Sequence, residues 1–144
     1  MTAPTGTADT PPRRLGRSVW AVFLGFIAVV ILSLGTDQIL HVFKVYPPWG
    51  VPMWDPLLNA LALGYRIVFT VIGGYIAARF APYAPMRHAV ALGIIGLIPG
   101  AAGAVFAISR PDFGPIWYPI ALAIVGLPCC WVGGLLYQAK HPER

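Results

Sequence analysis

The chain alternates between long uninterrupted apolar runs and short polar or proline-rich connections. Apolar runs lie at about residues 19–40, 57–80, 89–108 and 116–137. At ~1.5 Å rise per helical residue, each is long enough to cross a ~30 Å hydrocarbon core. Transmembrane strands would need only about ten residues with alternating polarity, whereas these runs are continuously apolar. The pattern predicts an all-α, polytopic integral membrane protein with four transmembrane helices.

The segments outside the runs are short. Residues 1–17 form a Thr/Pro-rich N-terminal tail that we expect to be disordered, residues 18–140 form the transmembrane domain, and residues 141–144 form a C-terminal tail. A basic stretch before an apolar run is also typical of a signal peptide. However, the first run exceeds the usual length of ~7–15 residues and ends in SLGTDQ rather than an A-x-A site, so we expect a retained anchor.

Composition agrees with a membrane protein. The 144 residues are 58% hydrophobic and only 10% charged, whereas soluble domains average about 25% charged residues. The two cysteines are adjacent, which excludes a disulfide scaffold. The low content of charged residues also excludes a soluble globular domain, whose surface would need more of them.

The positions of the basic residues predict the orientation of the chain. Cytoplasmic loops are enriched in Lys and Arg near the ends of membrane spans. Seven basic residues flank the spans on one side and two on the other, which predicts that both termini are cytoplasmic and that residues 41–56 and 109–115 are outer loops. The net charge of +5 follows from this asymmetry, and no basic cluster is interleaved with aromatic residues, so we expect no nucleic-acid partner. The seven are Arg13, Arg14, Arg17, Arg79, Arg87, Lys140 and Arg144; the two are Lys44 and Arg110.

A P-x-W-x-P motif precedes two of the four spans. Proline fits the first turn of a helix, and Trp is typical of the headgroup region, so the motif is expected to begin a span at the membrane interface. Both of these spans also carry a Gly-Gly pair near their far end. We interpret the pattern as a tandem duplication of one helical hairpin; the alternative is chance similarity of two interfacial loops. The motif residues are Pro52, Trp54 and Pro56, and Pro115, Trp117 and Pro119.

The third run carries glycines at helical spacing. Gly93, Gly96, Gly100 and Gly103 recur at intervals of three and four, which places them on one helix face. In lipid, small residues let helix backbones approach closely. The spacing predicts a close helix contact on this face, with either another span or another subunit.

Two charges fall inside the runs away from their cytoplasmic ends. Arg66 lies about 13 Å below the outer boundary at ~1.5 Å per residue, and Asp37 lies near the outer end of the first run. An unpaired charge at this depth is costly, so we expect an interhelical Asp37–Arg66 pair. The alternatives are a polar site for an anionic or hydrogen-bonding ligand, and simple snorkelling of Arg66. Several polar residues could line either arrangement: Thr36, Gln38, Asn59, Tyr65 and Thr70.

Motifs for soluble-style catalysis are absent from the sequence. It contains no HExxH, P-loop or G-x-S-x-G, and its histidines occupy no facing mid-membrane positions suited to haem ligation. We therefore expect no enzyme activity, no catalytic residues, no metal and no cofactor.

The chain resembles small, uncharacterised four-span inner-membrane proteins of bacteria. The resemblance spans residues 18–140 and is carried by the basic entry, by Tyr46-Pro47-Pro48-Trp49-Gly50 and by Tyr75-Ile76-Ala77-Ala78-Arg79. It implies the inner membrane but no activity. The first run has no mid-membrane Glu, a departure from small multidrug exporters.

Two functions follow as expectations. The first is a non-catalytic interaction or accessory subunit, in contact with the lipid bilayer and with a second copy or another membrane protein. The second is a small oligomeric transporter or channel with Asp37 and Arg66 in its pathway. A transporter needs polar residues across the whole membrane, and the third and fourth runs offer almost none.

Overall fold

Four long helices account for most of the chain. The computed structural model describes residues 14–143, with α1 at Leu15–Val42, α2 at Pro56–Phe80, α3 at Pro85–Ser109 and α4 at Trp117–Lys140. A 3₁₀ turn, η1 at Pro111–Phe113, connects α3 to α4. All four helices are long and apolar enough to cross a membrane, as the sequence predicts.

The helix ends refine the predicted segments. Helix α1 begins at Leu15, so the prediction of a disordered tail is wrong for residues 15–17. The helix can start this early because no proline occurs between residues 13 and 46. The rest of the disordered-tail prediction lies outside the described residues. Helix α2 begins at Pro56, and Asp55 caps it by accepting hydrogen bonds from the backbone N–H of Leu57 and Leu58.

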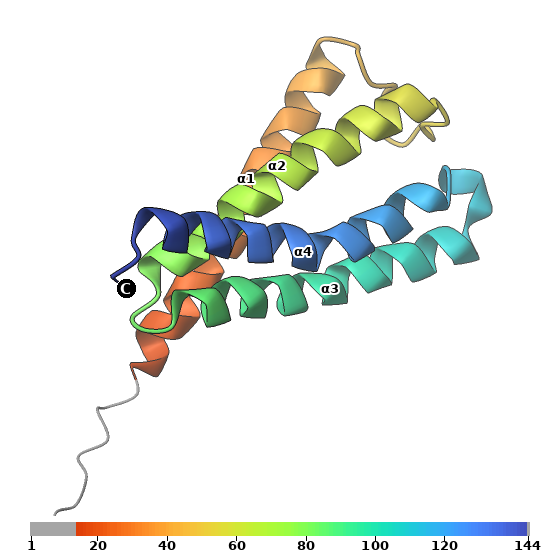
Figure 1. Cartoon of the computed structure of the whole chain (residues 1–144). Coiled ribbons are helices and arrows are strands. Elements are labelled where there is room, and N and C mark those ends of the chain that lie inside the picture. Colours follow the sequence, from red (N-terminus) through yellow and green to blue (C-terminus); the bar gives the residue numbers. More distant parts are fainter. Residues whose placement is uncertain (1–13, 144) are drawn as a thin grey trace, which may run out of the picture.

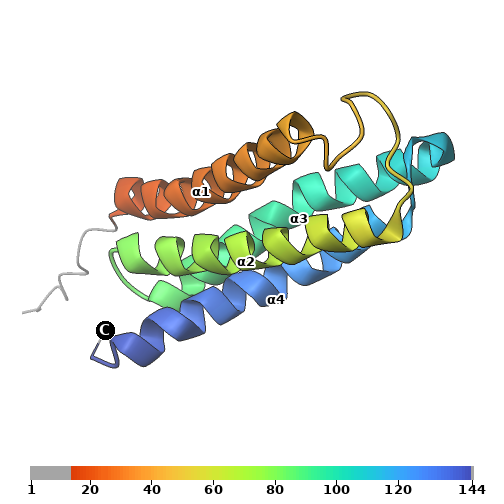
Figure 2. The same cartoon turned by 90° about the horizontal axis from the view of Figure 1, so that it is seen from above.

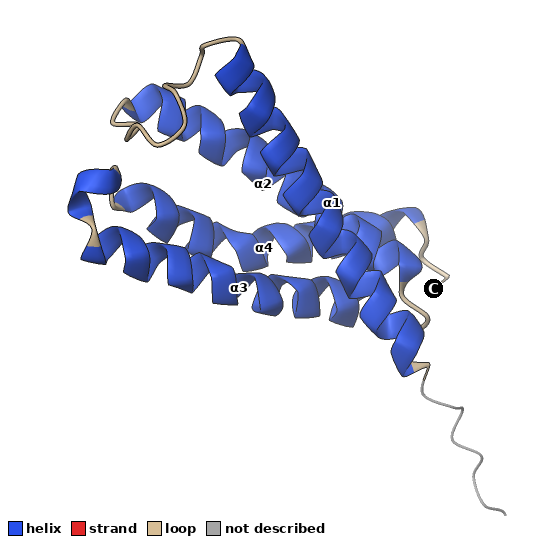
Figure 3. Ribbon diagram, turned by 180° about the vertical axis from the view of Figure 1, so that it is seen from behind, coloured by secondary structure: helices blue, strands red, loops and turns tan. Residues whose placement is uncertain are grey.

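The helices form an up-and-down bundle whose connections lie at two opposite ends (Figure 1). We call the end with residues 14, 81–84 and 141 the terminal end, and the end with residues 43–55 and 110–116 the loop end. The helices converge at the terminal end, and α1 and α2 spread away from α3 and α4 towards the loop end (Figures 1 and 3).

Helix α1 is peripheral in the bundle. Within the described residues, it packs against α2 and α3 but not against α4. Helix α2 contacts all three other helices, and the view from above shows it between α1 and α4 (Figure 2). A membrane partner or lipid therefore has access to more of α1 than of α2.

Small residues bring the helices together in the half of the bundle nearer the terminal end. A Cβ atom at Gly25 of α1 would lie 2.7 Å from the carbonyl oxygen of Gly73 in α2, and one at Gly74 would lie 2.7 Å from Cα of Cys130 in α4. A Cβ atom at Gly133 would collide with the backbone of α2 at Val71. Backbones that touch this closely leave no room for side chains, so glycine is required at these crossings.

Candidate functional site

The candidate site is a polar network between α1 and α2 in the half of the bundle nearer the loop end. Nη2 of Arg66 lies 2.5 Å from Oδ2 of Asp37, and their side chains are 22% and 10% exposed respectively. The structure thus brings together the two charges that the sequence singled out. An ion pair this close, held away from solvent, links α1 directly to α2.

Tyr65 completes the hydrogen bonding of the carboxylate. Its hydroxyl donates to Oδ1 of Asp37, while Arg66 donates to Oδ2. Nη1 of Arg66 also donates to the Tyr65 hydroxyl, at 3.2 Å. Both carboxylate oxygens of Asp37 therefore accept a hydrogen bond, and Asp37 is poorly placed to act as a free base.

Tyr46 connects the network to the loop at residues 43–55. Its side chain is buried, and its hydroxyl lies 3.2 Å from the hydroxyl of Tyr65. The pKa of the Tyr46 phenol is raised, because the effect of burial outweighs the opposite effect of its hydrogen bond with Tyr65. The phenol therefore stays protonated at neutral pH and remains a hydrogen-bond donor.

His41 and Trp49 fix the same loop from the other side. Nδ1 of His41 lies 2.7 Å from the carbonyl oxygen of Asp37, which can only accept, so Nδ1 carries the proton. The imidazole stacks on the Trp49 ring with centroids 3.9 Å apart and an interplanar angle of 4°. The loop is thus held to the end of α1 that carries Asp37.

Two cavities meet at Arg66. One, of about 220 Å³, lies beneath the loop and is lined by Asp37, His41, Tyr46, Trp49 and Tyr118, among others. The other, of about 350 Å³, lies deeper in the bundle and is mainly apolar. Arg66 lines both cavities, and its guanidinium carbon lies 5.9 Å from the centre of the Tyr118 ring. The charge of Arg66 is offset by Asp37, so the pair carries no net charge.

The other polar candidates, Thr36, Gln38, Asn59 and Thr70, form no hydrogen bond with the side chains of the pair, and Gln38 is exposed on α1. Thr36 donates to the carbonyl oxygen of Leu32, Asn59 donates to those of Met53 and Asp55, and Thr70 donates to that of Arg66. Residues 14–143 contain no group of three or more His, Cys, Asp or Glu side chains that could hold a metal ion.

The four glycines of α3 divide into two pairs. A Cβ atom at Gly93 would lie 3.0 Å from Cα of Leu127, and one at Gly100 would lie 3.2 Å from Cα of Ala123, so both face α4. Gly96 and Gly103 have open space where a Cβ would project. Within the chain, the predicted close contact is therefore made by Gly93 and Gly100, whereas Gly96 and Gly103 are turned away from the α4 backbone. Contact of these two glycines with another subunit, the other alternative, stays a prediction.

Both P-x-W-x-P motifs lie at the loop end, but they begin their helices differently. Pro56 is the first residue of α2, whereas α4 begins at Trp117 and includes Pro119 in its first turn. The residue between Trp and the second Pro also differs, because Asp55 caps α2 while Tyr118 lies near Arg66. The remaining motif residues, Pro52, Trp54 and Pro115, precede these helix starts within the two loops.

Comparisons with known proteins identify no relative. No family model, curated protein or solved structure matches the chain. Its function is therefore inferred from its own residues and contacts.

Tyr46 and His41 are the network residues that the sequence does not assign to the site. His41 follows Asp37 by four residues, which places both on one face of α1 and was a usable signal. Tyr46 lies in a loop, where no periodicity reveals its direction. Only the path of residues 43–55 brings it to Tyr65.

Proposed function

We propose that this chain is a multi-pass protein of the cytoplasmic membrane, with both termini in the cytoplasm and two tandem hairpins in the bilayer. The orientation is supported by the basic residues, since Arg14, Arg17, Arg79, Arg87 and Lys140 gather at the terminal end. Lys44 and Arg110 are their only counterparts in the loops at the other end. The cytoplasmic side is the one that carries the excess of Lys and Arg.

We further propose that the protein acts without catalysis, as an interaction or accessory subunit for another membrane protein or for a second copy of itself. The observation that carries this proposal is the closed hydrogen bonding of the Asp37–Arg66–Tyr65 network. Asp37 accepts from both neighbours, so the most polar part of the membrane domain holds helices together instead of presenting an acid or a base to a substrate.

The free face of α1 is the proposed contact surface. Two of its apolar side chains are largely exposed and line none of the cavities described above: Ile31 and Ile39 are 63% and 56% exposed. The backbone of α1 makes no close approach to α4, and its loop-end half diverges from α3. A transmembrane helix of a partner could pack there without disturbing the bundle.

One observation favours the transporter or channel as a second candidate. Arg66 lines both the pocket under the loop and the deeper cavity, so it stands where a path between them would pass. In this alternative the ion pair opens to let a polar solute through. The apolar lining of the deeper cavity supports the accessory role instead.

Topology is tested with reporter fusions after residues 50, 84, 112 and 144. We expect the reporters to lie outside, inside, outside and inside in that order, because the basic asymmetry recurs at every connection. Any other order contradicts the proposed orientation.

The accessory role is tested with a photo-crosslinking amino acid at Ile31 or Ile39 of α1, with Ile124 of α4, which is 67% exposed, as control. We expect a protein adduct of one discrete mass from the α1 positions and only lipid adducts from position 124. Lipid adducts at all three positions would contradict the proposal. An ionic conductance in proteoliposomes that Arg66→Leu alters would favour the channel.

A further inference from the structure

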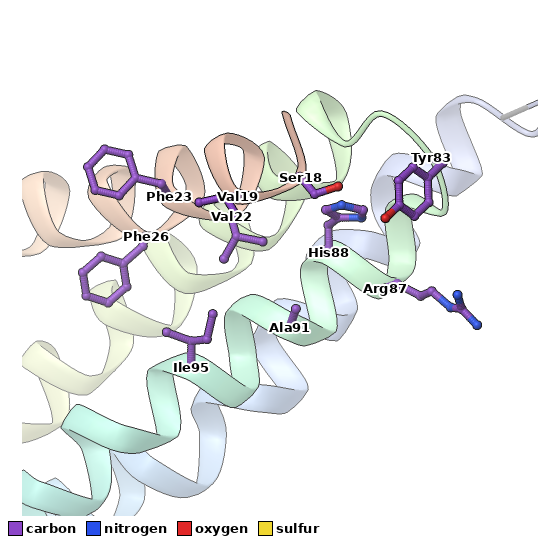
Figure 4. Close-up of a pocket in the computed structure, with 10 residues that line it drawn as sticks. All are labelled: Ser18, Val19, Val22, Phe23, Phe26, Tyr83, Arg87, His88, Ala91 and Ile95. Carbon is purple, nitrogen blue, oxygen red and sulfur yellow. The ribbon is translucent and has the colours of Figure 1, made fainter. Parts of the chain in front are cut away.

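A groove runs between α1 and α3 at the terminal end of the bundle (Figure 4). Its volume is about 550 Å³, and its walls are mainly apolar. Val22 and Phe26 of α1 and Ala91 and Ile95 of α3 line its deeper part, while Ser18, Arg87 and His88 lie near the ends of the two helices. The groove is thus apolar along its length and polar at its mouth.

Two arginines lie on the helix turns at this end of the groove, and in Figure 4 the Arg87 side chain extends outwards, away from His88. Arg17 and Arg87 lie in the first turns of the two helices that form the groove, and neither first turn contains an acidic residue. In the described part of the chain, Glu143 is the only carboxylate side chain at the terminal end. The ion pair of Asp37 with Arg66 lies in the other half of the bundle, so these arginines keep their charge available.

The helix starts at the groove also lack caps. Neither Arg14 before α1 nor Ala84 before α3 provides a side-chain hydrogen bond to the first turn. The first N–H groups of a helix carry partial positive charge and favour an anion. Helix α2, which starts at the opposite end, has its first turn capped by the carboxylate of Asp55.

Ser18 adds an unpartnered hydroxyl at the same place. Its Oγ is buried and has no hydrogen-bond partner within residues 14–143. In Figure 4 the Ser18 side chain points towards His88, on the polar side of the groove. A buried hydroxyl without a partner costs free energy that a hydrogen-bond acceptor would recover.

We propose that this groove binds one anionic phospholipid of the leaflet at the terminal end. One acyl chain lies along the apolar walls, and the phosphate lies at the mouth, near the Arg17 and Arg87 guanidinium groups and the uncapped helix starts. The order of features along the helices, basic and then apolar, matches the order of phosphate and chain in a phospholipid. The site goes beyond the accessory role and does not depend on it.

Binding of the anionic headgroup is tested with the full-length protein in vesicles of phosphatidylcholine and phosphatidylglycerol. The protein is then extracted from these vesicles in mild detergent. Retained lipid is counted by native mass spectrometry. We expect phosphatidylglycerol to be retained in preference to phosphatidylcholine. In the double variant Arg17→Gln/Arg87→Gln, retention of phosphatidylglycerol should fall about fivefold for each of the two arginines removed. Arg17→Lys/Arg87→Lys should keep most of it, because the charge remains.

The matched control is Lys44→Gln/Arg110→Gln, which removes two positive charges at the loop end. It should leave phosphatidylglycerol retention unchanged. An equal fall in both double variants would mean that net charge alone attracts the lipid, and would overturn the site. Equal retention of phosphatidylcholine and phosphatidylglycerol by the unmodified protein would overturn the proposed preference for an anionic headgroup.

The chain half is tested by filling the groove with Ala91→Phe. We expect this variant to lose retained phosphatidylglycerol while Ala102→Phe, at an exposed position in the other half of α3, retains it. Inorganic phosphate at millimolar concentration should not displace the lipid. Displacement would indicate a site that binds phosphate but no acyl chain, and would overturn the proposal. A change in oligomeric state of Ala91→Phe without loss of lipid would assign the groove to a second copy. Helical circular dichroism of each variant confirms that it is folded.

Discussion

The helices of the bundle associate through different interactions near its two ends. Near the terminal end, the backbones of α2 and α4 pack directly against each other at Gly74 and Gly133. Near the loop end the helices diverge, and Asp37, Arg66 and Tyr65 link α1 to α2 by an ion pair and hydrogen bonds. Because lipid is as apolar as the helices, close packing and polar bonds are what hold them together, and α1 and α2 rely on polar bonds where they diverge from α3 and α4.

The same contrast appears in the charges. The ion pair at the loop end is internal and leaves no net charge, whereas the arginines of the terminal end have no acidic neighbour in the first turns of α1 and α3. Paired charges serve the fold, and unpaired charges remain free to meet lipid headgroups.

The largest effect should come from Gly133→Ala. The added Cβ would collide with the backbone of α2 and lie 2.6 Å from the amide nitrogen of Tyr75, so the helices must separate. We expect a loss of more than about 3 kcal/mol in the free energy of unfolding in detergent, at the upper end of overpacking effects. Gly126→Ala of the same helix, where a Cβ meets open space, is the control and should cost nothing. Equal stability of the two variants would show that the α2–α4 crossing is looser than described.

The next largest effect should come from breaking the ion pair. Asp37→Leu leaves a guanidinium that cannot lose its proton, whereas Arg66→Leu leaves a carboxylate that can become protonated and keep its bond to Tyr65. We expect Asp37→Leu to cost about 3 kcal/mol and Arg66→Leu less, since removing one partner of a buried pair strands the other. Unfolding of the single variants in detergent measures both.

The double variant Asp37→Leu/Arg66→Leu should recover much of this loss, because neither charge is left alone. A double-mutant cycle gives the coupling directly. Additivity of the two single changes within about 0.5 kcal/mol would mean that the pair contributes nothing. Arg66 would then fit the pathway of the channel alternative better than a structural role.

The sequence predicts the helices because their cause is local. A run of about twenty apolar residues has few options in a bilayer other than a spanning helix, and prolines such as Pro56 and Pro85 mark where helices start. The pairing of Asp37 with Arg66 is also predictable, since each is the other's best partner at that depth. These inferences need composition and spacing but no tertiary detail.

The close crossings are not predictable in the same way. The sequence shows which α3 glycines share a stripe, but whether a neighbour covers all of it depends on the position of α4. The structure places Gly93 and Gly100 against α4 and leaves Gly96 open. The tightest crossings involve Gly74 and Gly133, which belong to Gly-Gly pairs that indicate a repeat in the sequence but not a helix contact.

A smaller effect should separate the glycines of α3. A side chain at Gly100 meets Cα of Ala123 at 3.2 Å, whereas one at Gly96 meets open space. We therefore expect Gly100→Leu to cost about 2 kcal/mol and Gly96→Leu to be nearly neutral, with Ile94→Leu as a conservative control. Thermal unfolding in detergent measures all three. A loss at Gly96 equal to that at Gly100 would indicate that a second subunit covers the open glycine.

The smallest effect should come from Tyr46→Phe, which keeps the ring but removes the hydroxyl that meets Tyr65. The change removes the neutral hydrogen bond with Tyr65 and a longer one, at 3.5 Å, to the carbonyl oxygen of Leu58, so we expect a cost of about 1 kcal/mol. Residues 43–55 would also be held less firmly and become easier to cleave in limited proteolysis. Tyr83→Phe, whose hydroxyl lies at the terminal end, is the control. If Tyr46→Phe leaves both stability and cleavage unchanged, the loop is fixed by the His41–Trp49 stack alone, and the polar network of the loop end closes at Tyr65.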